Sequence, residues 1–264
     1  MSKKREGNIK LATAFIFLVF CLIILSMLYK FFVTLRESKF DGAHKFVVAF
    51  VGRQTTVVSF SPQTNSISSL KIDTRVNPVG ISGFLEAPID GMIFINKNSI
   101  SDRDIPGILF TSSVPFGNKL SGITEIDAFR LFLFSKAVPS TSIYDRELSS
   151  GLNDAQTSAI ISLTFNDPTI VQENKSIQII NAANAYGLGS RLATFIANIG
   201  GNVILVTTAN NISNSSKIIY SGKKTYTVEK LSEYLGMPLI KSGQQGLSDV
   251  TIVIGTDKIN SKNF

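Results

Sequence analysis

The chain has 264 residues, of which 44% are hydrophobic, and a formal net charge of +7. That length allows one large domain or two small ones. The positive excess lies at the two ends of the chain and the middle is slightly acidic, so the charge does not indicate a nucleic-acid-binding protein. Cys21 is the only cysteine, which excludes an intrachain disulfide and a cysteine-based zinc site.

An uncharged apolar stretch, residues 11–29, follows a basic N-terminal segment. As a helix it reaches roughly 28 Å, about the thickness of the hydrocarbon core of a bilayer. The predicted anchor extends to residue 35 if Lys30 reaches the interface. The basic segment predicts a single-pass topology, in which residues 1–10 form a cytoplasmic tail and the bulk of the chain lies outside the cell membrane. A cleaved signal peptide is the alternative, but its apolar region is shorter and ends at small residues, whereas bulky and charged residues follow here.

The middle of the chain, residues 40–166, is predicted to be a mixed α/β domain. Short runs rich in β-branched and aromatic residues predict strands at 46–51, 55–60, 66–72 and 92–95. Two helices follow. The first starts at the Thr124–Asp127 box and carries Ile126, Phe129, Phe132 and Leu133 at helical spacing. The second spans 152–165, with Leu152, Ala155, Ala159 and Leu163 on one side. The polar stretch 166–175 is the expected domain boundary.

The last third, residues 174–258, has the clearest pattern. Strands are predicted at 177–181, 203–207, 217–220 and 249–254, and helices at 188–199 and 226–235. The runs 177–180 and 203–206 are typical of strands covered on both faces. Residues Leu188, Leu192, Phe195, Ile196 and Ile199 form one apolar stripe of the first helix. This βαββαβ order predicts a ferredoxin-like split βαβ domain, and the whole chain is of the α/β (α+β) class.

The order of short motifs in this last third resembles the C-terminal domain of the LytR/CpsA/Psr cell-envelope proteins. In that family a strand ending in Asn leads to a Gly-rich turn, a helix, a Gly and a strand, followed by an "IxY" strand and an "Asp-Val-x-Val-x-x-Gly-x-Asp" strand. The matching residues are Asn181, Gly187, Gly189, Gly200, Ile219, Tyr220, Asp249, Val250, Gly255 and Asp257. The resemblance implies a cell-envelope setting and supplies no reaction.

The middle region resembles, more faintly, the opening of the catalytic domain of the same family. Ser61-Pro62 and the segment 72–74 match its frame, but its acidic and Arg-Asp motifs are altered. If the family's transferase activity were kept, the resemblance implies that Arg53, Asp73 and Arg75 hold Mg²⁺ and a pyrophosphate by clamping charge. A divergent glycopolymer transferase acting on lipid-pyrophosphate-linked polymers is therefore the alternative to a non-catalytic role. Whether the chain is an enzyme is left open, with a non-enzyme favoured.

One turn is a candidate anion-binding site. The residues Gly187, Gly189, Ser190 and Arg191 open a predicted helix, whose N–H groups together with the arginine suit a phosphate. A purely structural turn is the competing interpretation, because neither the sixth position of a dinucleotide motif nor the following acid is present. His44 is the only histidine, so neither a Ser-His-Asp triad nor a histidine metal site is expected.

These observations predict a membrane-anchored, extracytoplasmic binding or scaffold protein of the bacterial cell envelope. Its expected partners are the membrane and either peptidoglycan, an anionic wall polymer or another envelope protein. No nucleic acid, no catalytic residue, no resident metal and no cofactor are expected; Mg²⁺ enters only with the transferase alternative. A tail of about ten residues is too short to fold as a DNA-binding domain.

Overall fold

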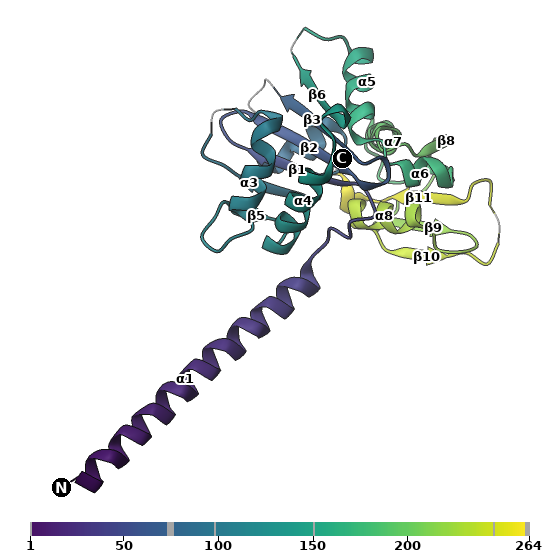
Figure 1. The fold of residues 1–264 in the computed structure, drawn as a ribbon. Coiled ribbons are helices and arrows are strands. Elements are labelled where there is room, and N and C mark those ends of the chain that lie inside the picture. The colour runs from purple at the N-terminus through teal and green to yellow at the C-terminus, as the bar shows by residue number, and fades with distance from the viewer. Residues whose placement is uncertain (1, 73–76, 98, 150, 245, 262–264) are drawn as a thin grey trace.

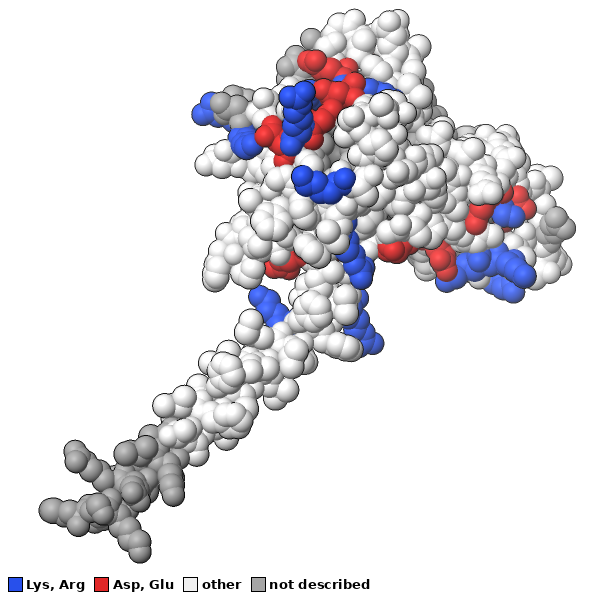
Figure 2. Space-filling model, in the orientation of Figure 1, with Lys and Arg blue, Asp and Glu red and all other residues white. Residues whose placement is uncertain are grey.

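The computed structural model describes residues 2–72, 77–97, 99–149, 151–244 and 246–261 as one long helix joined to two α/β units (Figure 1). The helix, α1, runs over Ser2–Glu37. Its segment Thr13–Glu37 is long and apolar enough to cross a membrane, with a mean hydropathy of 2.6, and none of it is buried against the rest of the chain. Figure 2 shows that Lys and Arg gather where this helix joins the other units, whereas most of its described length carries no charge.

The middle of the chain forms a six-stranded sheet in the order β5-β4-β1-β2-β3-β6. The strands are β1 (Phe46–Val51), β2 (Thr55–Ser61), β3 (Ser66–Ile72), β4 (Gly91–Phe94), β5 (Lys119–Ser121) and β6 (Ile143–Leu148). The first three strands are antiparallel neighbours, while β4 runs parallel to β1 and β6 runs parallel to β3. The four strands expected from the sequence are therefore present, and β5 and β6 extend the sheet at its two edges.

Helices cover both faces of this sheet. They are α2 (Ile81–Leu85), α3 (Ile105–Ser112), α4 (Glu125–Ala137) and α5 (Asp154–Phe165). Val48 and Phe50 of β1 pack with α3 and α4, and Val47 and Ala49 pack with α2 and α5. Because both faces are covered, β1 needs apolar side chains on both, and its sequence shows no polar alternation.

The C-terminal third forms a separate five-stranded sheet in the order β10-β9-β11-β7-β8. Its elements are β7 (Ser176–Asn181), α7 (Leu188–Asn198), β8 (Asn202–Thr208), β9 (Lys217–Tyr220), α8 (Tyr226–Leu235), β10 (Leu239–Lys241) and β11 (Val250–Ile254), and the short helix α6 (Pro168–Glu173) precedes them within the expected boundary. One core joins Ile177 and Ile179 of the sheet to Phe195 of α7 and Leu231 of α8. The predicted apolar stripe of α7 lies in this core.

The mixed α/β class and the element order are confirmed, but the ferredoxin-like pairing is corrected. In a split βαβ unit another strand lies between the two parallel strands, whereas here β7 and β8 pair directly and in parallel. The short strand β10, which the sequence did not suggest, pairs with β9. The burial predicted for residues 203–206 is also wrong. Strand β8 is the edge of its sheet, so Ile204, Leu205 and Val206 are exposed.

Two helices of the middle unit do not bury the apolar residues that the sequence pattern singles out. In α5 the buried side chains are Ile161, Thr164 and Phe165, and Leu163 on the predicted face is exposed. In α4 the buried positions are Asp127, Ala128, Leu131 and Ser135, and Phe129 and Leu133 are exposed. Periodicity identifies a face of a helix but does not show which face has a partner.

The exit of α1 is tied to the first turn of α4 by one buried carboxylate. Asp127 Oδ1 accepts hydrogen bonds from the Ser38 hydroxyl (2.7 Å) and from the backbone N–H groups of Lys39 and Phe40 (both 2.8 Å). Its Oδ2 accepts from the N–H and the hydroxyl of Thr124 in the capping box of α4. Arg130 closes the arrangement by donating to the Phe40 carbonyl. Hydrogen bonds thus fix the junction between α1 and the middle unit.

We expect Asp127→Ala to lower the free energy of unfolding by about 2–4 kcal/mol, because it removes a helix cap and leaves buried N–H groups without acceptors. Trypsin should then cleave faster after Lys39. Thermal unfolding and limited proteolysis of the detergent-solubilised chain measure both effects. Asp154→Ala, at an exposed position in the first turn of α5, is the matched control. Equal stability of the two variants would contradict the role given to Asp127.

Candidate functional site

A hollow of about 470 Å³ opens where β7 ends and α7 begins. The turn between them, the first turn of α7 and the end of β8 line it, and the residues involved include Asn181, Asn184, Tyr186, Gly187, Gly189, Ser190, Thr207 and Thr208. Three of the four residues predicted to form an anion site, Gly187, Gly189 and Ser190, are therefore brought together at one opening.

Local chemistry explains why the sequence folds this way at the hollow. The Asn181 side chain donates to the Ala185 carbonyl (2.8 Å) and accepts from the Ala183 N–H (3.1 Å), which shapes the turn. Gly187 caps α7 with φ of +77°, a conformation that favours glycine. At Gly189 an added Cβ would lie 3.0 Å from a methyl group of Val206, so the missing side chain lets α7 lie close to β8 without displacing that valine.

The electrostatics of the hollow differ from the prediction at Arg191. This residue does not line the hollow, and its Nε lies 3.6 Å from the Glu86 carboxylate of the middle unit. The residues that do line the opening are amides, hydroxyls, small residues and one phenol, that of Tyr186. The tyrosine ring is fully exposed, at 107% of its reference area. The opening thus offers uncharged hydrogen-bonding groups, a free aromatic face and the N–H groups of the α7 N-terminus.

Sequence reasoning missed Tyr186, although a signal was present. Turns rich in Asn, Ala and Gly lie on the protein surface. A tyrosine within such a turn therefore has no core to pack into, and its presence needs another reason.

Other residues of the family resemblance have structural roles in the sheet. Asp249 accepts from the N–H and hydroxyl of Ser176 (3.0 and 2.8 Å), contacts that hold the pKa of Asp249 below its usual range. Asp257 accepts from the Ser216 hydroxyl, which itself accepts from the Gly255 N–H. These hydrogen bonds join the ends of neighbouring strands, and the carboxylates of Asp249 and Asp257 lie outside the hollow.

Of the three residues singled out for the transferase alternative, Arg53 lies in the described part of the chain. Arg53 is exposed in the turn between β1 and β2, where its N–H donates to the Lys97 carbonyl. Asp73 and Arg75 lie outside the described residues. Within the part of the chain that the structure describes, no three His, Cys, Asp or Glu side chains are grouped as a metal ion would require. The proposed Mg²⁺ and pyrophosphate contacts stay predictions.

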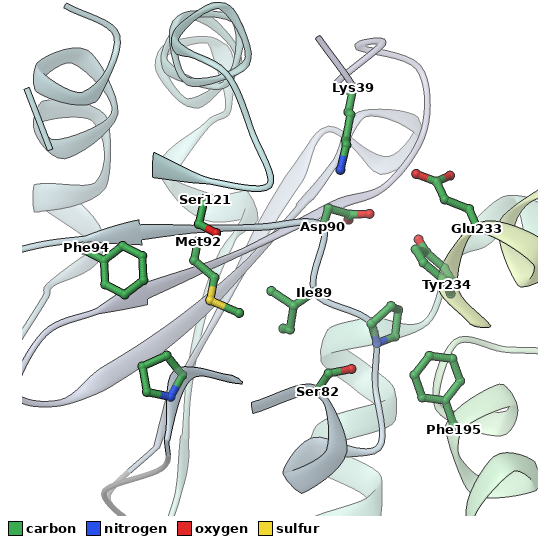
Figure 3. Close-up of a pocket in the computed structure, with 12 residues that line it drawn as sticks. Lys39, Ser82, Ile89, Asp90, Met92, Phe94, Ser121, Phe195, Glu233 and Tyr234 are labelled. Atoms are coloured by element: carbon green, nitrogen blue, oxygen red, sulfur yellow. The ribbon is translucent and has the colours of Figure 1, made fainter. Parts of the chain in front are cut away.

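A second hollow, of about 560 Å³, lies between the two units (Figure 3). Figure 3 shows Lys39, Asp90, Glu233 and Tyr234 gathered on one side, with Met92 and Phe94 on the other. Lys39 lies in the linker after α1, Asp90 directly precedes β4, and the others lie in β4 and α8. The hollow is therefore formed where the linker after α1, the middle unit and the C-terminal unit meet.

Asp90 is the unusual titratable group of this junction. Its Oδ2 accepts from the Val47 N–H at 2.7 Å. Burial raises the pKa of Asp90 to about 6, although nearby Lys230 and the Val47 N–H act in the opposite direction. Sequence reasoning missed this residue, whose only signal is a single acid before an apolar strand. Because burial disfavours its ionised form, Asp90 acts as a pH-dependent element at the junction of the units.

Replacement of Asp90 by Asn tests this element. A carboxyl whose folded pKa is raised contributes full stability below its unfolded pKa near 4, and that contribution is lost as pH rises to about 6. Asp90→Asn, which stays neutral, should match the parent chain at pH 4 and exceed it by about 1–3 kcal/mol at pH 7. Thermal unfolding at the two pH values measures the difference. Glu233→Gln, an exposed neighbour, should show no such pH-dependent gain, and equal stability of Asp90→Asn and parent at pH 7 would refute the interpretation.

Comparison with known proteins bears on the C-terminal unit. Residues 174–257 match the family described as "LytR cell envelope-related transcriptional attenuator". The comparison with curated proteins found no match.

Three solved structures illustrate the similarity at the level of structure. They are the Lin1025 protein from Listeria innocua (12% identity, 72% of this chain and 96% of that chain covered, TM-score 0.19), TagT of Bacillus subtilis (12%, 74% and 91%, 0.19) and TagV of B. subtilis (16%, 73% and 98%, 0.18). Identities and TM-scores this low indicate neither a shared activity nor a shared ligand. The family match confirms the predicted LytR C-terminal domain over residues 174–257, and it indicates a cell-envelope-related protein.

Proposed function

We propose that the chain is a single-pass membrane protein whose two α/β units stand outside the cell and bind, without catalysis, a polymer of the cell wall. The apolar segment Thr13–Glu37 supports the anchor, because it is long and apolar enough to span a bilayer and none of it is buried inside the described chain. The basic residues near the N-terminus support an orientation with that end in the cytoplasm.

The hollow at the N-terminus of α7 carries the proposal of binding. It combines an exposed aromatic ring with amide and hydroxyl groups in the domain that matches the cell-envelope family. Aromatic rings and directed polar groups are the usual means by which a site holds a ligand and fixes its orientation. No carboxylate, histidine, lysine or arginine is among the described residues that line this hollow, so its hydroxyls have neither a general base nor a charge clamp beside them.

The lining favours a neutral glycan over a highly charged polymer. Sugar rings present C–H faces that pack on an aromatic ring such as that of Tyr186, and their hydroxyl and acetamido groups pair with the Asn184 amide and with hydroxyls at the opening. An anionic polymer in the hollow would meet the N–H groups of α7, whereas Arg191 does not line the hollow and its Nε lies 3.6 Å from the Glu86 carboxylate. We therefore infer that peptidoglycan-type glycan is the main ligand and that an anionic substituent adds to binding at the helix end.

Co-sedimentation of the full, detergent-solubilised chain with isolated bacterial cell walls tests the proposal. Tyr186→Ala should weaken binding by roughly 5- to 30-fold, the cost of losing an aromatic anchor. Tyr144→Ala, which removes an exposed tyrosine of β6 in the middle unit, should bind like the parent chain. Equal binding by the two variants would exclude the hollow as the site.

Walls stripped of anionic polymer separate the two ligand classes. Binding that persists on stripped walls and changes little with salt supports a glycan. Binding that disappears on stripped walls and falls steeply with salt would assign the ligand to the anionic polymer instead. If the chain sediments with neither preparation, the wall is not its ligand, and a protein of the envelope takes its place.

A further inference from the structure

The surface of the middle unit next to the anchor carries an unusual group of exposed apolar side chains. Phe110 of α3 and Phe129 and Leu133 of α4 are each about half exposed, at 49%, 45% and 52%. Phe132 joins the aromatic residues into one patch, because its ring centroid lies 5.3 Å from that of Phe110 and 6.2 Å from that of Phe129. A contiguous patch of this kind on a folded domain marks a surface that meets an apolar partner.

The loop between α3 and β5, residues 113–118, extends this patch. Phe116 in that loop is fully exposed, at 107%, and Val114 is exposed as well. Phe116 also has a φ of +65°, a left-handed conformation that is rare and costly for a bulky residue. A folded protein has no reason of its own to hold a phenyl ring in this way, since the ring gains no burial.

The loop is held rigidly. The Gly117 N–H donates to the Val114 carbonyl (3.1 Å), and the Asn118 amide donates to the hydroxyls of Thr111 and Ser112 (both 3.1 Å). A Cβ on Gly117 would lie 1.8 Å from the Thr111 carbonyl oxygen, so only glycine permits this turn. The exposed ring is therefore presented in a fixed position.

The position of the loop identifies what it meets. Val114 and Phe116 line the same small hollow as Glu125, in the first turn of α4. That turn is where Asp127 holds the chain as it leaves α1. Figure 1 shows the α3–β5 loop on the side of the middle unit that faces α1. The loop thus lies on the side of the middle unit from which α1 leaves, and a bilayer around the apolar part of α1 would face this side.

We propose that the α3–β5 loop, with Phe116 at its tip and the patch of α3 and α4 behind it, inserts into the outer surface of the membrane that α1 spans. Aromatic side chains are favoured at the interface between lipid and water, and exposed cations nearby, such as Lys119 and Lys39, suit the lipid headgroups. This second contact would fix how the two units tilt over the membrane. The inference rests on the anchoring role of α1 in the proposed function.

The chain contains no tryptophan, so a single substitution gives a unique fluorescent probe. The full chain with Phe116→Trp is reconstituted into phosphatidylcholine vesicles with and without bromine on the acyl chains near the headgroups. Quenching of at least about twofold by the brominated lipid is expected for a ring at the interface. Tyr186→Trp is the matched control, because Tyr186 has the same 107% exposure but lies in the C-terminal domain, and it should not be quenched.

Phe20→Trp, within α1, reports insertion of the anchor itself. If Phe20→Trp is quenched and Phe116→Trp is not, the loop does not enter the membrane and the inference fails while the anchor stands. If Phe116→Trp and Tyr186→Trp are quenched equally, the contact is not specific to the loop and the inference also fails. If Phe20→Trp is not quenched, α1 is not a membrane anchor, and both the proposed function and this inference are wrong.

Discussion

The buried carboxylate of Asp127 decides how the rest of the structure is placed. It accepts bonds from three groups of residues 38–40 and from two groups of Thr124. A carboxylate removed from water needs such a set of donors, and the donors in turn are fixed by it. A helix followed by a free linker would leave the outer units at any angle to α1. With these bonds, the direction of α1 is fixed relative to the middle unit.

A second set of polar contacts fixes the segment that connects the two outer units. Lys45 at the start of β1 is buried, and its amine donates to the carbonyls of Thr164 and Asn166 at the end of α5 (2.6 and 2.7 Å). Burial lowers the pKa of Lys45 to about 7, although Asp167 favours its charge. The Asp167 carboxylate also accepts from the Tyr226 hydroxyl of α8 (2.8 Å). The two sheets have separate cores, yet these bonds fix the segment between them, and the Asn198 amide of α7 donates across the units to the Glu86 carbonyl (2.9 Å).

The sequence predicted local structure well and the surroundings of each element poorly. The strands of β1, β2 and β7 follow from their β-branched runs, and α7 from its stripe, because such patterns depend on neighbours in the chain. Which element packs against a given face of a helix or strand depends on contacts between residues far apart in the chain. The same kind of apolar run is buried in β1 and exposed in β8, since one strand is central and the other lies at an edge. For the same reason, periodicity predicts the apolar faces of α4 and α5 but does not predict that these faces are exposed. A strand order that departs from the ferredoxin-like arrangement likewise has no local signal.

At the candidate site, too, the sequence predicted the local backbone and did not predict the long-range contacts. Glycines and asparagine mark the turn at the α7 hollow because backbone geometry requires them, which the sequence reveals. The direction of Arg191, toward Glu86 and away from the hollow, depends on a residue more than a hundred positions earlier. Several residues that carry the family resemblance have structural roles. Asn181 shapes the turn, and Asp249 and Asp257 join strand ends through hydrogen bonds. A pattern made of structural residues preserves a scaffold while the side chains around its opening remain free to vary. Such a domain is suited to present a binding surface, and the chemistry of that surface has to be read from exposed residues such as Tyr186.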